Sequence, residues 1–173
     1  QNPSVPPKYV TALDKKFMTP EQRLDRAKVH FRQWLTMGRA FKAMVAMEHA
    51  LNKKYDTVIR IREDLFFYAP TKLDPTDLFQ AQRYDVIVSQ CDGWVGYNDK
   101  LVIMTRPAAG ALLPSLAIFG FSKLVDWSQI KNPETYTKQV ISSHLLLHVK
   151  SANAHETPII PARMNRADGF CLG

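Results

Sequence analysis

The chain has 173 residues, of which 46% are hydrophobic and 23% charged, so its composition is that of a folded domain and excludes a disordered segment. Its longest apolar stretch, 108–121, is interrupted by glycine and proline and is shorter than the ~20 residues that span a bilayer. We therefore expect no membrane span and a soluble protein, cytoplasmic or membrane-peripheral. The net charge of +7 predicts attraction to anions but does not distinguish nucleic acid, acidic lipid and nucleotide phosphate.

The amino-terminal part divides into a proline-containing segment and a long helix. Residues 1–18 are expected to form an extended arm or linker, and residues 19–173 a single α/β domain. Thr19-Pro20-Glu21-Gln22 has the pattern of a capping box, so a helix should begin there. The apolar stripe runs to about Asn52, either as one long helix or as two helices stacked end to end with a break at Gly38. Acidic residues alternate with the basic residues of this helix, which favours a solvated face and makes nucleic acid an unlikely partner.

The rest of the chain alternates between strand and helix patterns. β-branched residues and turn formers bound the expected strands, and apolar periodicity marks the expected helices. The expected order is strand 57–64, strand 84–89, strand Leu101–Thr105, helix 108–124, a helix from Pro133 that reaches Val149, and strand 158–161. This order predicts an α/β fold with a layered, mostly parallel or mixed sheet and flanking helices.

Three charged side chains of the first strand form the candidate site. Arg60, Arg62 and Asp64 should share one side of the strand because successive side chains alternate. Open α/β sheets bind ligands beyond the carboxyl ends of their strands, where a carboxylate can hold a cation and arginines can hold phosphate. The arrangement suits a nucleotide diphosphate. The alternative is that an arginine pairs with Asp64, Glu63 or Glu48 for structure alone. Function is favoured because a buried charge costs several kcal/mol unless it is paired or used.

Two motifs resemble those of a known family. The run from Glu48 to Asp64, with Tyr55-Asp56 before the strand and Arg60-x-Arg62-x-Asp64 at its end, resembles the Arg-x-Arg-x-Asp segment of GT-A type polysaccharide glycosyltransferases. These include WavE-like lipopolysaccharide synthesis proteins and algal or viral relatives. Gly96-Tyr97-Asn98-Asp99-Lys100 is similar to their downstream Asn-Asp-Lys/Arg segment, and the resemblance covers about Trp34 to Lys150. It implies transfer of a sugar from a nucleotide-sugar donor to a glycan or other hydroxyl acceptor.

The resemblance also implies site roles, with two departures. Asp64 would match the last Asp of the element that binds Mn²⁺ or Mg²⁺, but Arg62 occupies the place of the first Asp, which puts metal dependence in doubt. Arg60 and Arg62 could instead neutralise the leaving diphosphate directly. The first sixteen residues do not resemble the first nucleotide-binding strand of such enzymes. Either the chain is the carboxyl-terminal portion of a longer enzyme, or the base is held in another way.

The glycine-containing loop 91–100 supplies the remaining candidates. Asp99 is the expected catalytic base because a transferase that inverts the anomeric centre needs a carboxylate to deprotonate the acceptor hydroxyl. Asp92 and Asn98 are expected to bind substrate, and Trp94 to stack on a sugar ring. The alternative for this loop is a plain turn.

Two other functions stay open. One is a non-catalytic basic module that binds nucleic acid or an acidic polymer. The other is a degenerate transferase fold that serves as an interaction subunit and needs a second chain to complete its sheet.

Overall fold

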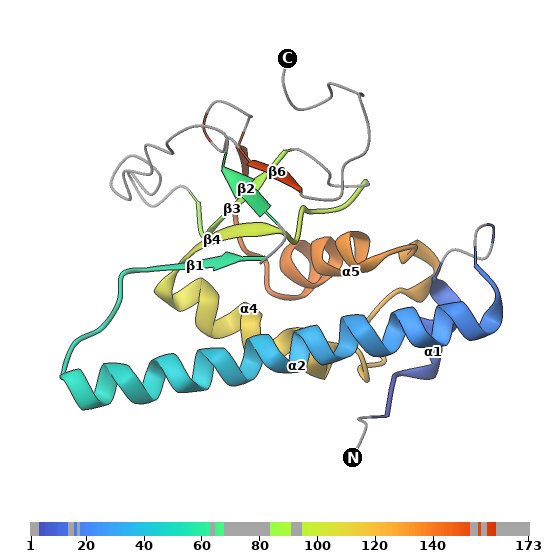
Figure 1. The fold of residues 1–173 in the computed structure, drawn as a ribbon, viewed down its shortest axis with the longest axis horizontal. Helices are drawn as coiled ribbons and strands as arrows, with labels where there is room; N and C mark the ends of the chain where they lie inside the picture. Colours follow the sequence, from blue (N-terminus) through green and yellow to red (C-terminus); the bar gives the residue numbers. More distant parts are fainter. Residues whose placement is uncertain are drawn as a thin grey trace.

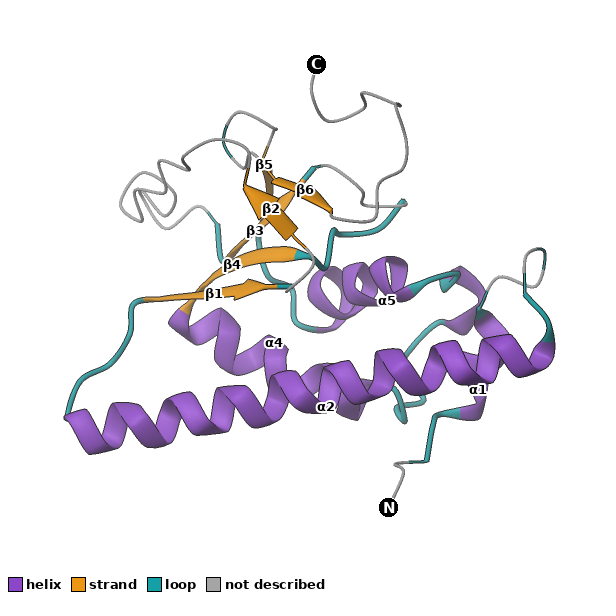
Figure 2. Ribbon diagram, viewed as in Figure 1, coloured by secondary structure: helices purple, strands orange, loops and turns teal. Residues whose placement is uncertain are grey.

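The computed structural model describes residues 4–13, 16, 18–62, 65–67, 84–90, 95–152, 156 and 159–161. These residues form a mixed α/β fold in which the helices lie on one side of a four-stranded sheet and a short two-stranded ribbon lies on the other (Figures 1 and 2). The expected α/β class with a mixed sheet and flanking helices is confirmed. None of the helices in the described part of the chain combines the length and hydropathy needed to cross a membrane.

The long helix α2 (Pro20–Leu51) begins at the predicted capping box. Thr19 Oγ1 accepts a hydrogen bond from the Gln22 amide at 3.3 Å, and Gln22 Oε1 accepts one from the Thr19 amide at 2.9 Å. The helix ends at Asn52, which has a left-handed φ of 48°. Of the two expected alternatives, one long helix is confirmed, because α2 packs along α4 (Arg106–Phe119) and continues through Gly38.

The amino-terminal segment differs from the expected extended arm. Pro7–Ala12 form a short helix, α1, which packs against α2. The Tyr9 side chain is fully buried, contacts the Trp34 and Tyr136 rings and lies with its hydroxyl 2.7 Å from His30 Nδ1. The arm expected over 1–18 is therefore wrong for these residues, since burial of an aromatic ring favours a docked segment over a solvated one.

The main sheet has the strand order β1-β4-β3-β5. The strands are β1 (Thr57–Ile61), β3 (Val86–Ser89), β4 (Leu101–Thr105) and β5 (Val149–Ala152). Central β4 is antiparallel to β1 and β3, and β3 is parallel to β5. The side chains of β3 are all buried, while β1 is an edge strand with alternating exposure. The first strand thus ends at Ile61, earlier than the expected 64.

The remaining boundaries differ from expectation in two places. α4 begins at Arg106 and ends at Phe119, where 108–124 was expected. The helix expected to run from Pro133 to Val149 is wrong at its end: α5 (Pro133–Gln139) passes into a single π-helical turn, η3 (Val140–His144), and Val149 pairs with Val86. β-branched Val149 joins the sheet because β3 offers it a parallel partner. The predicted last strand is seen as β6 (Ile159–Pro161), which pairs with β2 (Leu65–Phe67).

Candidate functional site

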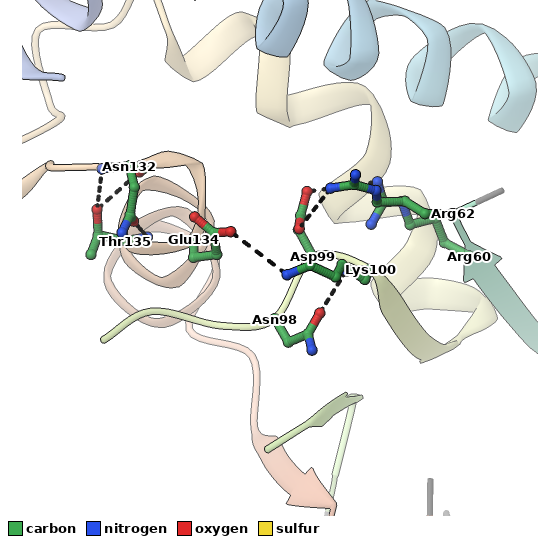
Figure 3. A network of polar contacts seen from close by, with 8 residues as sticks. All are labelled: Arg60, Arg62, Asn98, Asp99, Lys100, Asn132, Glu134 and Thr135. Carbon is green, nitrogen blue, oxygen red and sulfur yellow. Dashed lines mark hydrogen bonds and ion pairs between the residues drawn. The ribbon is translucent and has the colours of Figure 1, made fainter. Parts of the chain in front are cut away.

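A buried carboxylate contacts Arg60 of β1 and Arg62, which directly follows the strand. Asp99 Oδ2 lies 3.8 Å from Arg60 Nη2, and Asp99 Oδ1 lies 3.8 Å from Arg62 Nη1 (Figure 3). The side chains of Arg60 and Asp99 are only 13% and 9% exposed. Arg60 and Arg62 thus share one side of their strand, as the alternation predicts. Glu48, one of the alternative partners considered for them, pairs instead with Arg106 at 2.6 Å.

The loop before β4 positions Asp99 through two hydrogen bonds, one within the loop and one to α5. The Lys100 amide donates to Asn98 Oδ1 at 2.7 Å, which closes a side-chain turn around Asp99. The Tyr97 amide donates to the Glu134 carbonyl at 3.1 Å, so the loop lies directly against the start of α5. A Cβ on Gly96 would come within 2.1 Å of the Glu134 carbonyl carbon, so only glycine permits this approach. Within the described residues 95–100 of the loop, Asn98 to Lys100 form a turn that places Asp99.

Glu134 is a second carboxylate of the site. It lies in the first turn of α5, which the reciprocal Asn132 and Thr135 capping box fixes (Figure 3). Lys100 Nζ is 4.0 Å from Glu134 Oε1. Burial, and then the charge of Asp99, raises the pKa of Glu134 above its ordinary value. Two neighbouring carboxylates in unlike surroundings are typical of sites that need one ionised group and one proton carrier.

A polar cleft of about 910 Å³ opens beside these carboxylates. Its charged lining residues are the cationic Arg26, Arg62, Lys131 and Lys138 and the acidic Asp99 and Glu134. Amide and hydroxyl side chains make up much of the remaining wall, and Ser142 and Ser143 of the π-helical turn lie on it. The cleft therefore suits a polar, hydroxyl-rich ligand that carries negative charge.

The structure brings together Arg60, Arg62, Asn98 and Asp99, which are four of the predicted site residues. The other three, Asp64, Asp92 and Trp94, lie outside the described residues.

Metal binding through Asp64 therefore stays a prediction. Within the described ranges, no group of three or more His, Cys, Asp or Glu side chains could hold a metal ion.

Sequence reasoning missed Glu134, Lys100 and Arg26. In the sequence, Glu134 follows Asn132-Pro133 and has the pattern of an ordinary acidic residue at a helix start. Arg26 is one of many basic residues on α2. Only its place on the cleft wall sets it apart.

Comparison with known proteins found no matching family model, curated protein or solved structure. The resemblance to GT-A type glycosyltransferases therefore stays a prediction.

Proposed function

We propose that the chain is a glycosyltransferase-like domain of GT-A type that binds a nucleotide sugar in the polar cleft and transfers the sugar to a hydroxyl acceptor. The observation that carries this proposal is the pair of carboxylates Asp99 and Glu134 on the cleft wall, one beside two guanidiniums and the other with a raised pKa. A glycan or another hydroxyl compound serves as the acceptor.

The charge and size of the cleft support a diphosphate ligand. Its volume of about 910 Å³ falls within the roughly 300 to 1,000 Å³ of small-molecule sites. Arg62 offers a planar guanidinium that can bind two phosphate oxygens at once, and Arg26 lines the same cleft. These positive charges stabilise the negative charge that develops on the leaving diphosphate.

Glu134 is better suited to the role of catalytic base than Asp99, which was the base expected from the sequence. The Asp99 carboxylate contacts two guanidiniums, so we assign it the positioning of Arg60 and Arg62. In the proposed step the acceptor hydroxyl gives its proton to Glu134 as its oxygen attacks the anomeric carbon. The bond from that carbon to the diphosphate oxygen breaks, and the electron pair leaves with the diphosphate. A base with a raised pKa suits this transfer near neutral pH.

A divalent metal ion is part of the proposed donor complex. Mn²⁺ or Mg²⁺ would be held by Asp64 together with oxygens of the diphosphate, and would add to the charge neutralisation that the arginines supply. Measuring nucleotide binding with and without Mn²⁺ separates the contribution of the metal from that of the guanidiniums.

The test is the melting temperature of the protein with a panel of nucleotide diphosphates and nucleotide sugars. A ligand at about a hundred times its dissociation constant should raise the melting temperature by roughly 5 to 10 °C. Arg62→Ala should lose this shift. Arg39→Ala, which removes an exposed arginine from the same basic helix, should keep it.

Turnover is then measured as release of nucleotide diphosphate from the donor that binds. Glu134→Gln should retain the melting shift and lose turnover, because the amide cannot accept the proton. If no nucleotide diphosphate shifts the melting temperature, with or without Mn²⁺, the proposal is wrong.

A further inference from the structure

The outer edge of β1 presents main-chain groups that the sheet does not use. The Arg62 amide donates to the Lys100 carbonyl at 2.9 Å, and the Arg106 amide donates to the Asp56 carbonyl at 2.9 Å. In an antiparallel pair, hydrogen-bonded residues alternate with residues whose amides and carbonyls point outward. The even-numbered residues of β1 therefore pair with β4, and Ile59 and Ile61 direct their main-chain groups away from the sheet.

A groove runs along this edge and is lined by residues of β1 and of α2. Its volume is about 870 Å³. Apolar side chains from the helix line one wall, among them Met37, Phe41 and Met44. On the strand side, Ile59 and Ile61 are 46% and 50% exposed. The groove thus offers apolar contact area directly beside an open sheet edge.

The groove is also cationic. Arg26, Arg60 and Arg62 line it, and none of the described residues that line it is acidic. Asp99 contacts Arg60 and Arg62 from outside the groove, so three guanidiniums and one carboxylate leave a net positive charge here. Arg60 projects on the opposite side of β1 from Ile59 and Ile61, because side chains alternate along a strand. A ligand lying along the strand would therefore meet apolar groups on one side and a guanidinium on the other.

From these three features we propose that an extended acidic peptide binds in the groove and adds to the sheet as a strand antiparallel to β1. This mode of recognition takes affinity from main-chain hydrogen bonds and specificity from alternate side chains. The groove adjoins the polar cleft and shares Arg26, His30, Gln33 and Arg62 with it, but the strand edge of β1 belongs to the groove, and its occupancy does not depend on glycosyl transfer.

The register of the edge predicts the peptide pattern. Two peptide residues hydrogen-bond with Ile59 and Ile61 and lie beside their exposed side chains, so both should be apolar. The residue between them lies opposite Arg60, at the close spacing of a non-hydrogen-bonded pair, so it should be Asp or Glu. The expected motif is an acidic residue between two apolar, β-branched residues.

Charge disfavours a second copy of the chain in the symmetric register that pairs Ile59 of one copy with Ile61 of the other, because the two Arg60 residues would then face each other. Like charges directly opposite one another destabilise a strand pair. The same guanidinium attracts an acidic peptide. The other symmetric register pairs Ile59 with Ile59 and places Arg60 opposite Val58, and ultracentrifugation tests for it.

The probe is a fluorescently labelled peptide, Ser-Thr-Val-Glu-Val-Thr-Ser, measured by fluorescence anisotropy. One matched peptide replaces Glu by Lys, and another carries N-methyl groups on both Val residues to remove their main-chain donors. The Glu peptide should bind at least about 10-fold more tightly than either control.

Protein variants test the strand edge and the charge separately. Ile59→Pro removes an outward amide, which an edge strand tolerates, and should weaken binding at least about 10-fold, whereas Ile59→Val keeps the amide and should bind as the wild type does. Arg60→Glu should reverse the preference in favour of the Lys peptide. This reversal is informative even if Ile59→Pro disturbs the fold.

Amide hydrogen exchange gives the residue-level readout. The Ile59 and Ile61 amides should exchange rapidly in the free protein and become protected with the Glu peptide. The proposal would be overturned if the Lys peptide or the N-methylated peptide bound with the same affinity as the Glu peptide. Protection of these amides in the free protein would also overturn it, and ultracentrifugation would then show whether a second copy or the chain itself covers the edge.

Discussion

Replacing Gly96 by alanine should separate the Asp99 loop from α5. The added Cβ would lie 2.1 Å from the carbonyl carbon of Glu134 and 2.3 Å from the amide nitrogen of Thr135. Both are main-chain atoms, so no side-chain rotation relieves the clash. To restore an ordinary contact of 3.4 Å, the loop and helix would have to move apart by about 1.3 Å, which is 3.4 minus 2.1.

The energetic cost has two parts. Overpacking of this kind costs about 1 to 3 kcal/mol. The displacement also weakens the hydrogen bond from the Tyr97 amide to the Glu134 carbonyl, which is worth about 1 kcal/mol. The free energy of unfolding should therefore fall by about 2 to 4 kcal/mol, and the melting temperature by roughly 10 °C.

Urea denaturation measures the stability change, and Gly38→Ala is the matched control. A Cβ at Gly38 would lie 3.5 Å from Pro114 Cα, which is an ordinary contact, and alanine is favoured over glycine inside a helix by about 1 kcal/mol. Gly38→Ala should therefore stabilise the protein while Gly96→Ala destabilises it. If the free energy of unfolding of Gly96→Ala lies within about 0.5 kcal/mol of the wild-type value, the close approach of the loop and α5 does not exist in solution.

The remaining predictions concern pH. Burial, and then Arg26, lowers the pKa of His30 from 6.5 to about 4, so the unfolded chain gains a proton before the folded one as pH falls. The wild type should lose up to about 3 kcal/mol of stability between pH 6.5 and 4, and His30→Gln should flatten this slope in urea titrations. The hydrogen bond from Arg106 holds the pKa of Glu48 at about 2, so its stabilisation is complete above 4.5 and is lost towards pH 2. Glu48→Gln should be less stable than the wild type at pH 7, and this difference should vanish towards pH 2; an unchanged difference would remove the ion pair from the explanation. The pKa of Glu134 is raised above 4.5, so the wild type loses stability as pH rises through that raised value. The free energy of unfolding of Glu134→Gln, relative to that of the wild type, should therefore be higher at pH 8 than at pH 4. If this difference is the same at both pH values, Glu134 is not buried as described.

Local patterns predicted the main elements of the fold. The capping box at Thr19 marks the start of α2 because a side-chain hydrogen bond to the adjacent turn needs no distant partner. The β-branched run that begins at Thr57 and the strand Leu101–Thr105 are also visible in the sequence. Predictions were wrong where a residue contacts a partner far away in the sequence. Tyr9 packs in an aromatic cluster where an extended arm was expected, and Val149 pairs with Val86 where a helix was expected.

The candidate site was also predicted only in part, because some of its contacts join residues that are far apart in the sequence. Alternation along β1 placed Arg60 and Arg62 on one side, and turn chemistry marked Asn98 and Asp99. No local pattern reveals that Asp99 lies against both arginines, because β1 and the loop are brought together by pairing of β1 with β4. Glu134 comes from a helix some 35 positions downstream of Asp99 and looks in the sequence like an ordinary first-turn acid.

The sequence by itself therefore determined the helix start, the identity of the strands and the side of β1 that carries charge, since these depend on hydrogen bonds and periodicity within a few residues. Only the tertiary structure decided which carboxylate contacts the arginines, which acid has a raised pKa, and that β1 lies at the edge of the sheet beside a groove. These properties depend on burial and on contacts between residues far apart in the chain, and a local pattern contains no information about either.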